Sequence, residues 1–198
     1  MSMKIPLFPL NTVLFPEGEL QLRLFEPRYL DMVSECLRSD SGFGICLIRE
    51  GKEAGELAEF FPMGTYVKIS DWDQMDDGLL GIKVTGERRF KVESYDVQKD
   101  NLCMGDVTLL DEDDELLPVT YQNFSDLLKE IANRYELPLM DVPERFEDAA
   151  WVSDRLAELL PFEISAKQSL LEMDNALNRF DYMQALLEKI DSGEYSQS

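Results

Sequence analysis

The most informative chemical feature of this 198-residue sequence is that it contains no histidine. Histidine is the side chain best suited to proton transfer near neutral pH and is the commonest metal ligand. Without it, neither a Ser-His-Asp site nor a Cys-His site can be built. The 40 Asp and Glu residues leave a hydrolase that uses carboxylates alone as one alternative, but no pair stands out among so many. The sequence therefore nominates no catalytic residue.

Two short motifs invite a ligand interpretation. Gly81 and Gly86 have the spacing of a phosphate-binding loop, but the next two residues are Glu and Arg where that loop needs Lys and then Ser or Thr. The aspartate-rich run 71–78 resembles a calcium loop, yet Met75 occupies a position that requires an oxygen ligand. We interpret the first motif as a strand with glycines at its ends and the second as a hairpin turn. No metal and no cofactor are predicted.

The charge of the chain excludes two classes of partner. Its formal net charge is −21 and its pI is about 4.2. Nucleic-acid binding depends on clustered Lys and Arg, so an acidic surface would repel the phosphate backbone. The same charge disfavours an anionic membrane surface. We expect neither nucleic acid nor membrane as a partner.

The cysteines and the N-terminus both indicate the cytoplasm. Cys36, Cys46 and Cys103 form no C-x-x-C pair, and an odd number of cysteines does not suggest a disulfide framework. We expect buried free thiols. The first residues are interrupted by prolines and form neither a signal peptide nor a membrane span of ~20 apolar residues.

The first half of the chain predicts short strands. Leu20, Leu22 and Leu24 alternate with polar residues, which is the pattern of a half-buried strand, and Phe25 breaks the alternation as a strand end packed on both sides. Turn residues, Gly86 among them, separate further strand-like segments. These expected strands are 43–49, 65–72, 79–85, 89–97 and 102–110. Their number and spacing indicate a twisted antiparallel sheet closed into a barrel or sandwich.

Prolines mark the ends of several of these elements. Pro6, Pro9 and Pro16 lack a backbone donor, so the segments that hold them are expected at edges, strand ends or bulges. Pro27 has the fixed φ suited to the first position of a helix. A helix is therefore predicted from Pro27 to the polar stop at 39–42.

The second half of the chain is predicted to be helical. Residues 111–115 are all acidic, so they are expected to form a solvated junction between domains. Beyond them the apolar spacing changes to that of helices. Ser165 and Gln168 have the spacing of a capping box, which predicts a helix that begins at Ala166. The predicted α+β fold is an N-terminal β-rich pseudo-barrel with one short helix over 1–115, followed by a C-terminal α-helical bundle over 116–198.

Three blocks of sequence, in order, carry a resemblance to a known family. Residues 5–29 contain the runs P-L-F-P-L, V-L-F-P and L-x-L-R-L-F-E-P-R-Y, and the run Gly86–Phe90 and the helical run 155–172 follow. Together they resemble the substrate-binding domain of the ATP-dependent Lon proteases, and most of all the small bacterial proteins that consist of that domain alone. One departure is Glu17, where the family often has glycine. A Glu there resists positive φ, so Gly18 is expected to supply the flexibility of the turn.

The resemblance implies the recognition part of a protease without its ATPase and Ser-Lys peptidase modules. The expected partners are therefore unfolded or exposed polypeptide segments, and components of a protease. The expected function is non-catalytic recognition of protein segments through exposed apolar surface. The alternative is a small-molecule pocket between the two subdomains, because ligand sites favour domain junctions.

Five large apolar residues are the candidates for the binding surface. Phe60, Phe61, Met63, Trp72 and Met75 lie beside loop or turn residues, where large apolar side chains have less reason to be buried than within strands. An exposed apolar patch usually marks an interaction site. The alternative is that the same side chains cover the ends of the barrel core.

Overall fold

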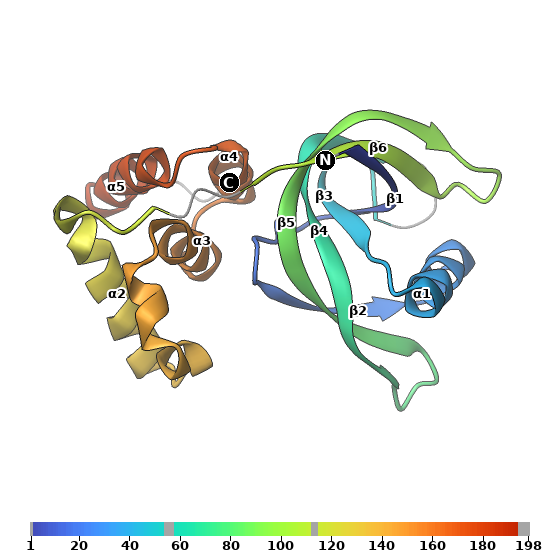
Figure 1. Ribbon diagram of the computed structural model, residues 1–198, viewed down its shortest axis with the longest axis horizontal. Coiled ribbons are helices and arrows are strands. Elements are labelled where there is room, and N and C mark those ends of the chain that lie inside the picture. The colour runs from blue at the N-terminus through green and yellow to red at the C-terminus, as the bar shows by residue number, and fades with distance from the viewer. Residues whose placement is uncertain (1, 54–57, 112–114, 194–198) are drawn as a thin grey trace. The chain divides into compact units, whose positions relative to one another are not determined.

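The computed structural model describes residues 2–53, 58–111 and 115–193 of the chain (Figure 1). The chain divides into two compact units, Met1–Asp111 and Glu112–Ser198. The six described strands lie in the first unit and four of the five α-helices in the second, so the predicted α+β class is confirmed. Most of the predicted acidic junction, residues 112–114, lies outside the described residues, and the domain boundary at 115 stays a prediction.

The first unit consists of six strands and one helix. In chain order they are β1 (Ser2–Leu10), β2 (Glu19–Leu24), α1 (Pro27–Ser39), β3 (Phe43–Glu50), β4 (Glu59–Gln74), β5 (Leu80–Val97) and β6 (Cys103–Leu109). The sheet order is β2-β5-β4-β3-β1-β6, and β6 also pairs with β5. Five strands therefore close into a ring, and β2 extends the sheet beyond it (Figure 1). The β1–β3 pairing is parallel and the others are antiparallel.

A single long strand replaces two of the predicted ones. All of the segments 79–85 and 89–97 except Leu79 belongs to the continuous strand β5, so the prediction that Gly86 is a turn residue is wrong. Gly86 has another role: a Cβ atom there would lie 2.4 Å from the Phe15 carbonyl oxygen, much too close for any side chain. The glycine thus lets the β1–β2 loop cross directly over β5.

The same loop fixes where β2 pairs with β5. The Glu17 N–H donates to the Gly86 carbonyl, and the Gly86 N–H donates to the Gly18 carbonyl, each at 2.8 Å. Two residues of the loop thus face one residue of β5, which is a β-bulge. Glu17 itself holds the left-handed φ of 59°, so the expectation that Gly18 supplies the flexibility is wrong. Positive φ at the first residue is the mark of the G1 type of bulge, and here Glu17 is at that position.

The prolines of β1 do not interrupt its hydrogen bonding, although β1 lies between two other strands of the sheet. Its pairing with β6 covers Ser2 to Leu7, and its pairing with β3 covers Leu7 to Leu10. The two ladders overlap only at Leu7. Pro6 and Pro9 each pair on one side alone, as residues without an N–H must.

Helix α1 begins and ends as predicted. It starts at Pro27, after Glu26 in the extended conformation that a following proline favours. It ends at Asp40, which has the left-handed φ of 48°. The buried face of α1 covers one core cluster of the first unit through Tyr29, Met32 and other apolar side chains.

The second unit is built around helix α3. Its α-helices are α2 (Gln122–Arg134), α3 (Ala149–Leu159), α4 (Ile164–Glu172) and α5 (Ala176–Asp191), and short 3₁₀ helices span Val119–Tyr121, Pro138–Asp141 and Pro143–Glu147. Helix α3 packs against α2, α4 and α5, and its residues from Ala149 to Ala157 are all buried. The predicted capping box is wrong, because α4 begins at Ile164 and the Gln168 amide donates to Glu172 instead. Real caps are present elsewhere: the Asp148 side chain accepts from the Trp151 N–H at 3.0 Å.

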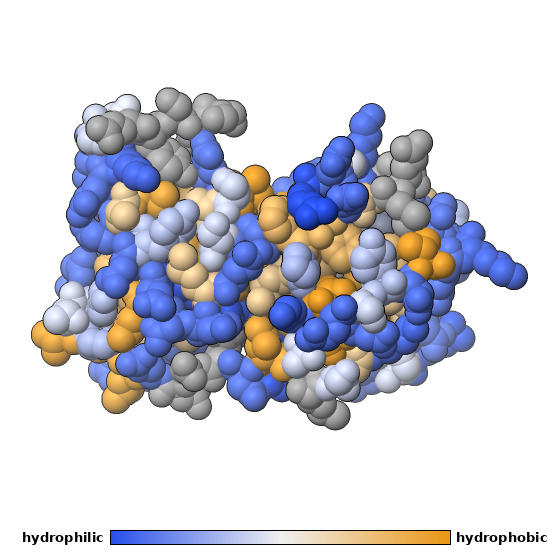
Figure 2. Space-filling model, turned by 90° about the horizontal axis from the view of Figure 1, so that it is seen from above, coloured by the Kyte–Doolittle hydropathy of each residue, from blue (hydrophilic) through white to orange (hydrophobic). Residues whose placement is uncertain are grey.

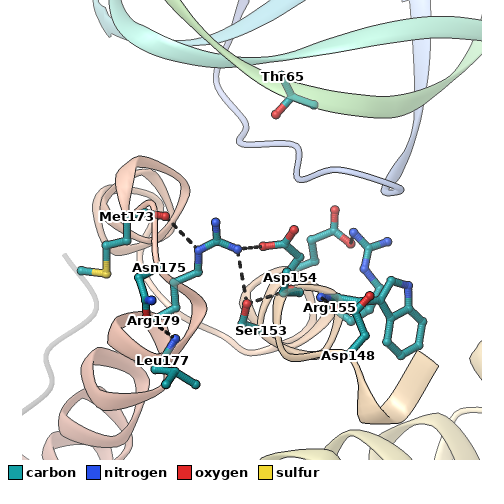
Figure 3. A network of polar contacts seen from close by, with 12 residues as sticks. Thr65, Asp148, Ser153, Asp154, Arg155, Met173, Asn175, Leu177 and Arg179 are labelled. Atoms are coloured by element: carbon teal, nitrogen blue, oxygen red, sulfur yellow. Dashed lines mark hydrogen bonds and ion pairs between the residues drawn. The ribbon is translucent and has the colours of Figure 1, made fainter. Parts of the chain in front are cut away.

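A buried ion pair joins α3 to α5 (Figure 3). The Arg179 guanidinium is fully buried and donates to Asp154 Oδ1 at 2.6 Å and to Ser153 Oγ at 3.3 Å. It also donates to the Met173 carbonyl at 3.0 Å, which holds the α4–α5 turn against α3. Since a buried charge is costly when it loses its partner, this network fixes the helices to one another.

The positive φ of Glu17 predicts that glycine is more stable than alanine at this position. We expect Glu17→Gly to be more stable than Glu17→Ala by about 1 kcal/mol, because both remove the side chain and only glycine adopts positive φ without steric cost. Urea unfolding of the two variants, compared with wild type, measures the difference. Equal stability of the Gly and Ala variants would show that the turn is unstrained.

The ion pair predicts a large asymmetry between single and double substitutions. We expect Arg179→Met to destabilise the second unit by about 3–5 kcal/mol, because the buried Asp154 carboxylate then loses the charge of the Arg179 guanidinium. The double variant Arg179→Met with Asp154→Leu should regain most of that loss. Urea unfolding followed by the fluorescence of the buried Trp151 reports on this unit. The exposed pair Arg134–Glu130 provides the control, since Arg134→Met should cost less than about 1 kcal/mol.

Candidate functional site

A three-stranded ribbon of the sheet extends past the ring of the first unit. It consists of β2, the first half of β5 and the second half of β4, with Leu22 and Trp72 paired to Ile82 from either side. Residues 75–79 connect β4 to β5 as a tight hairpin (Figure 1). The Met75 N–H donates to the Leu79 carbonyl at 2.8 Å, and Gly78 has a φ of 83°. The prediction of a hairpin turn in the aspartate-rich run is confirmed.

The face of this ribbon carries an open hollow of ≈ 360 Å³. Trp72 and Met75 lie on it, 60% and 42% exposed. A Cβ atom at Gly81 would lie 3.2 Å from Met75 Cγ, so Met75 lies against the bare backbone of β5. Any side chain at position 81 would displace Met75 or fill the hollow. The hollow is lined by Gln21, Leu22, Arg23, Asp71, Trp72, Asp73, Met75, Gly81, Ile82 and Lys83.

Charged side chains surround this hollow. Arg23 forms an ion pair with Asp77, and Lys83 pairs with Glu19 at 2.8 Å. Asp71 and Asp73 instead accept hydrogen bonds from the backbone N–H groups of the residues that follow them, at 2.9 and 2.8 Å. The two basic residues are therefore neutralised, whereas Asp71 and Asp73 have no salt bridge within the described residues. On the face of the molecule seen in Figure 2, hydrophobic residues form patches that are separated by hydrophilic residues.

The structure separates the five predicted binding residues into two groups. Trp72 and Met75 share the hollow, but Phe60, Phe61 and Met63 lie at the opposite end of β4. Nine residues of strand correspond to roughly 30 Å, so the groups cannot form one small site. Phe60 packs against Tyr95, with ring centroids 5.0 Å apart, and against one core cluster.

A second hollow, of ≈ 290 Å³, lies between β2 and the elements β1 and α1. Its lining is mostly apolar and includes Phe25, which is 59% exposed. The prediction that Phe25 is packed on both sides is therefore wrong. The chain leaves the sheet at this residue to enter α1, so no neighbouring strand covers it, and Pro27 is the signal that could have shown this. The hollow is lined by Phe8, Leu10, Gln21, Leu22, Arg23, Leu24, Phe25, Glu26, Tyr29 and Glu53.

Tyr29 forms the rigid aromatic wall of this second hollow. Its ring stacks on Phe8 with centroids 3.9 Å apart, and the Arg28 guanidinium lies 4.7 Å from the Tyr29 centroid. Arg28 is fixed in turn by Glu26 Oε2 at 2.9 Å and by the Asn101 carbonyl at 3.0 Å. Burial raises the pKa of Tyr29 to about 12, so the wall is uncharged at neutral pH.

Among the described residues, no cysteine lines either hollow. No group of three Cys, Asp or Glu side chains within them is arranged to hold a metal ion. Cys36, Cys46 and Cys103 are free and buried, as predicted, and burial raises the pKa of each thiol. Among the helices that the structure describes, none is both long and apolar enough to cross a membrane.

A sheet closed by the β5–β6 pairing, with an accessory ribbon, and a second unit of helices define an α+β class of domain. A family model described as the ATP-dependent protease La (LON) substrate-binding domain matches residues 4–189. The chain belongs to this family. The resemblance inferred from the three sequence blocks is thereby confirmed.

Similarity to individual proteins agrees with the family. A crystal structure of a Lon N-terminal domain protein from Xanthomonas campestris matches with a TM-score of 0.78 and 35% identity, over 92% of this chain and 98% of that one. The N-terminal domain of a Mycobacterium avium complex Lon protease has the same fold, with a TM-score of 0.68 at 16% identity over the same shares of the two chains. The Lon protease of Cytophaga hutchinsonii is 25% identical over 195 residues. That match covers 93% of this chain and 24% of the relative, so the chain spans about a quarter of the length of such proteins.

The raised pKa of Tyr29 predicts a loss of stability at alkaline pH. An unfolded tyrosine has a pKa of about 10, so the stability that buried neutral Tyr29 contributes is present below pH 10 and is lost as the pH rises to about 12. We expect Tyr29→Phe to reduce the alkaline loss of unfolding free energy by about 2 kcal/mol. Urea unfolding at pH 9 and pH 11.5 tests this, with the exposed Tyr135→Phe as control. An identical alkaline loss in wild type and Tyr29→Phe would contradict the assignment.

Proposed function

We propose that this chain is a non-catalytic module that recognises polypeptide segments through exposed apolar surface. The observation that carries the proposal is the pair Trp72 and Met75, which are exposed side by side on an open hollow of ≈ 360 Å³. Membership of the LON substrate-binding domain family supports the same class of partner. Phe60, Phe61 and Met63 stay a separate prediction, because they lie at the other end of β4.

The residue types in the hollow suit a variable partner. Methionine is flexible and polarisable, so it adapts to side chains of different shapes. Tryptophan gives a large apolar contact area and is enriched among residues that dominate binding energy. An open hollow lined by such residues favours many related segments over one shape-matched ligand.

The charge around the hollow sets the preferred partner. Asp71 and Asp73 are free of salt bridges within the described residues, and the whole chain carries a net charge of −21. Electrostatic complementarity therefore favours basic or weakly charged segments. Unfolded or exposed protein segments of that kind are the proposed partners, together with components of a protease, and nucleic acids and anionic membranes are not.

We further infer the architecture of this module, its lack of catalytic activity and its compartment. The ring of five strands supports a pseudo-barrel, and the packing of α3 against three other helices supports a helical bundle. The lack of histidine supports a role without catalysis. Three free buried thiols support the cytoplasm as its compartment.

Binding of an unfolded protein tests the proposal. We expect a reduced and alkylated model protein to bind wild type saturably and to bind Trp72→Ala at least tenfold more weakly, because a central aromatic residue contributes about 1.4 kcal/mol or more. Isothermal titration or fluorescence anisotropy measures the affinities. Tyr135→Ala is the matched control, since Tyr135 is 67% exposed in the second unit.

Two further variants locate the surface. Met75→Ala should weaken binding as Trp72→Ala does, and Phe61→Ala tests the far end of β4 independently. Failure of wild type to bind saturably would refute the proposal. An equal loss in Trp72→Ala and Tyr135→Ala would refute the assignment of the hollow.

A further inference from the structure

The pairing register shows which backbone groups of β2 point away from the sheet. In an antiparallel pair, hydrogen-bonded residue pairs alternate with non-bonded ones. The Gly86 N–H donates to Gly18, so hydrogen-bonded pairs recur at Leu20, Leu22 and Leu24. The N–H and C=O groups of Glu19, Gln21 and Arg23 are then directed to the opposite edge. Among the described strands β2 has one neighbour, β5, so no strand pairs with these groups.

The opposite edge of the ribbon confirms this alternation independently. Ile82 directs its backbone groups to Leu22, so its other partner, Trp72, must direct its N–H outward. The outward N–H of Trp72 is indeed taken by the Asp71 carboxylate, and that of Gln74 by the Asp73 carboxylate. Both edges therefore follow one consistent pattern.

The two edges of the ribbon differ in their access to another chain. On β4, aspartate side chains already occupy the outward N–H groups, and their charge repels an approaching backbone carbonyl. Natural proteins use charged residues in this way to prevent strand addition at an edge. On β2, no described side chain accepts from the outward N–H groups of Gln21 and Arg23. Among the residues that the structure describes, nothing occupies the β2 edge, whereas aspartate side chains block the β4 edge.

The apolar hollow of ≈ 290 Å³ lies beside the open edge. Its opposite wall comes from β1 and α1, through Leu10 and Tyr29, and not from β5. Gln21, Leu22 and Arg23 line this hollow and also the hollow that holds Trp72. An extended segment along β2 would thus place alternate side chains against apolar surface and continue the proposed binding face.

We propose that β2 accepts an extended segment of a partner polypeptide as an added strand. Main-chain hydrogen bonds to an open edge, with pockets for alternate side chains, are a known mode of peptide recognition. The inference rests on the proposed function and specifies its geometry. The partner segment has apolar side chains at every second position, because only those positions face Leu22, Leu24 and Tyr29.

The charge at this edge selects a basic segment. Arg23 is neutralised by Asp77, and Glu26 by Arg28. Glu53, on the wall of the hollow, accepts from the Asn11 N–H at 2.6 Å. Within the described residues no Lys or Arg forms a salt bridge with its carboxylate. A lysine or arginine at the end of the added strand would complement it.

Peptides with selectively methylated amides test the geometry. The probe is the capped peptide Lys-Thr-Leu-Thr-Leu-Thr-Leu-Lys. Residues directly opposite in a sheet share a face, so in an antiparallel pair its leucines oppose Leu20, Leu22 and Leu24. The amides of its second and third threonines then bond to Arg23 and Gln21. We expect N-methylation of the three threonine amides to weaken binding at least tenfold. N-methylation of the three leucine amides, which point away from β2, should change affinity less than threefold.

Proline substitution tests the same edge from the protein side. Gln21→Pro removes one outward N–H and leaves the bonds to β5 intact, because proline is tolerated where the N–H faces away from the sheet. We expect it to weaken peptide binding at least fivefold, whereas Gln21→Thr, which keeps the N–H, should bind as wild type does. If Gln21→Pro does not fold, Arg23→Pro and the methylated peptides test whether the β2 edge binds the peptide backbone.

Amide hydrogen exchange locates the added strand. Peptide should slow exchange at Gln21 and Arg23 at least tenfold and leave Leu22, already bonded to β5, unchanged. The edge inference would be overturned if the peptide still bound after threonine methylation and left the amides of Gln21 and Arg23 unprotected. In that case, Trp72-dependent binding of unfolded protein would still support the proposed function. Protection that appears without peptide and rises with protein concentration would identify a second copy of this chain as the occupant and would also overturn it. Absence of binding by both the peptide and the unfolded protein would refute both proposals.

Discussion

The first unit depends on one close approach, that of the Phe15 carbonyl to Gly86. No side chain can occupy position 86, because its Cβ would lie 2.4 Å from that oxygen. The contact brings the β1–β2 loop onto β5 and forces the bulge at Glu17, which in turn sets the register of β2. The register decides which backbone groups of β2 face outward. A single glycine in the middle of a long strand thus sets the register of β2, the strand that lines both hollows.

The edge that we propose as the binding edge must meet two requirements that usually conflict. A binding edge must be open, but an open edge also invites aggregation. Here the two outer strands divide these tasks, since Asp71 and Asp73 block the β4 edge and the β2 edge is left open beside apolar surface. The short length of β2, Glu19–Leu24, limits how much chain can be added. The excess of carboxylates in the whole chain gives two copies of it an electrostatic repulsion that opposes their pairing at this edge.

The second unit is stabilised in a different way. It has an excess of acidic residues, yet the most buried charge in its interior is the cation of Arg179. The guanidinium is satisfied by Asp154, Ser153 and the Met173 carbonyl, so it connects α3, the α4–α5 turn and α5 at one point. A small helical unit buries a low fraction of its surface, and a directional network of this kind selects one packing arrangement among several apolar ones.

The sequence by itself determined the local elements. Pro27 located the start of α1, the alternation of Leu20, Leu22 and Leu24 identified β2, and the missing histidine excluded whole classes of catalysis. These features depend on the chemistry of single residues or on short-range periodicity. The sequence also supplied the family, because ordered blocks of motif persist where overall identity is low.

Only the tertiary structure decided what those elements do together. Gly86 looked like a turn because a glycine is equally required for a turn and for a close approach, and the Phe15 carbonyl that distinguishes them is distant in sequence. Trp72 and Met75 were found among the apolar residues near turns, but their separation from Phe60, Phe61 and Met63 follows from the length of β4. The free edge of β2 could not be predicted at all, since it depends on which strands pair, and strand pairing is not encoded within one segment.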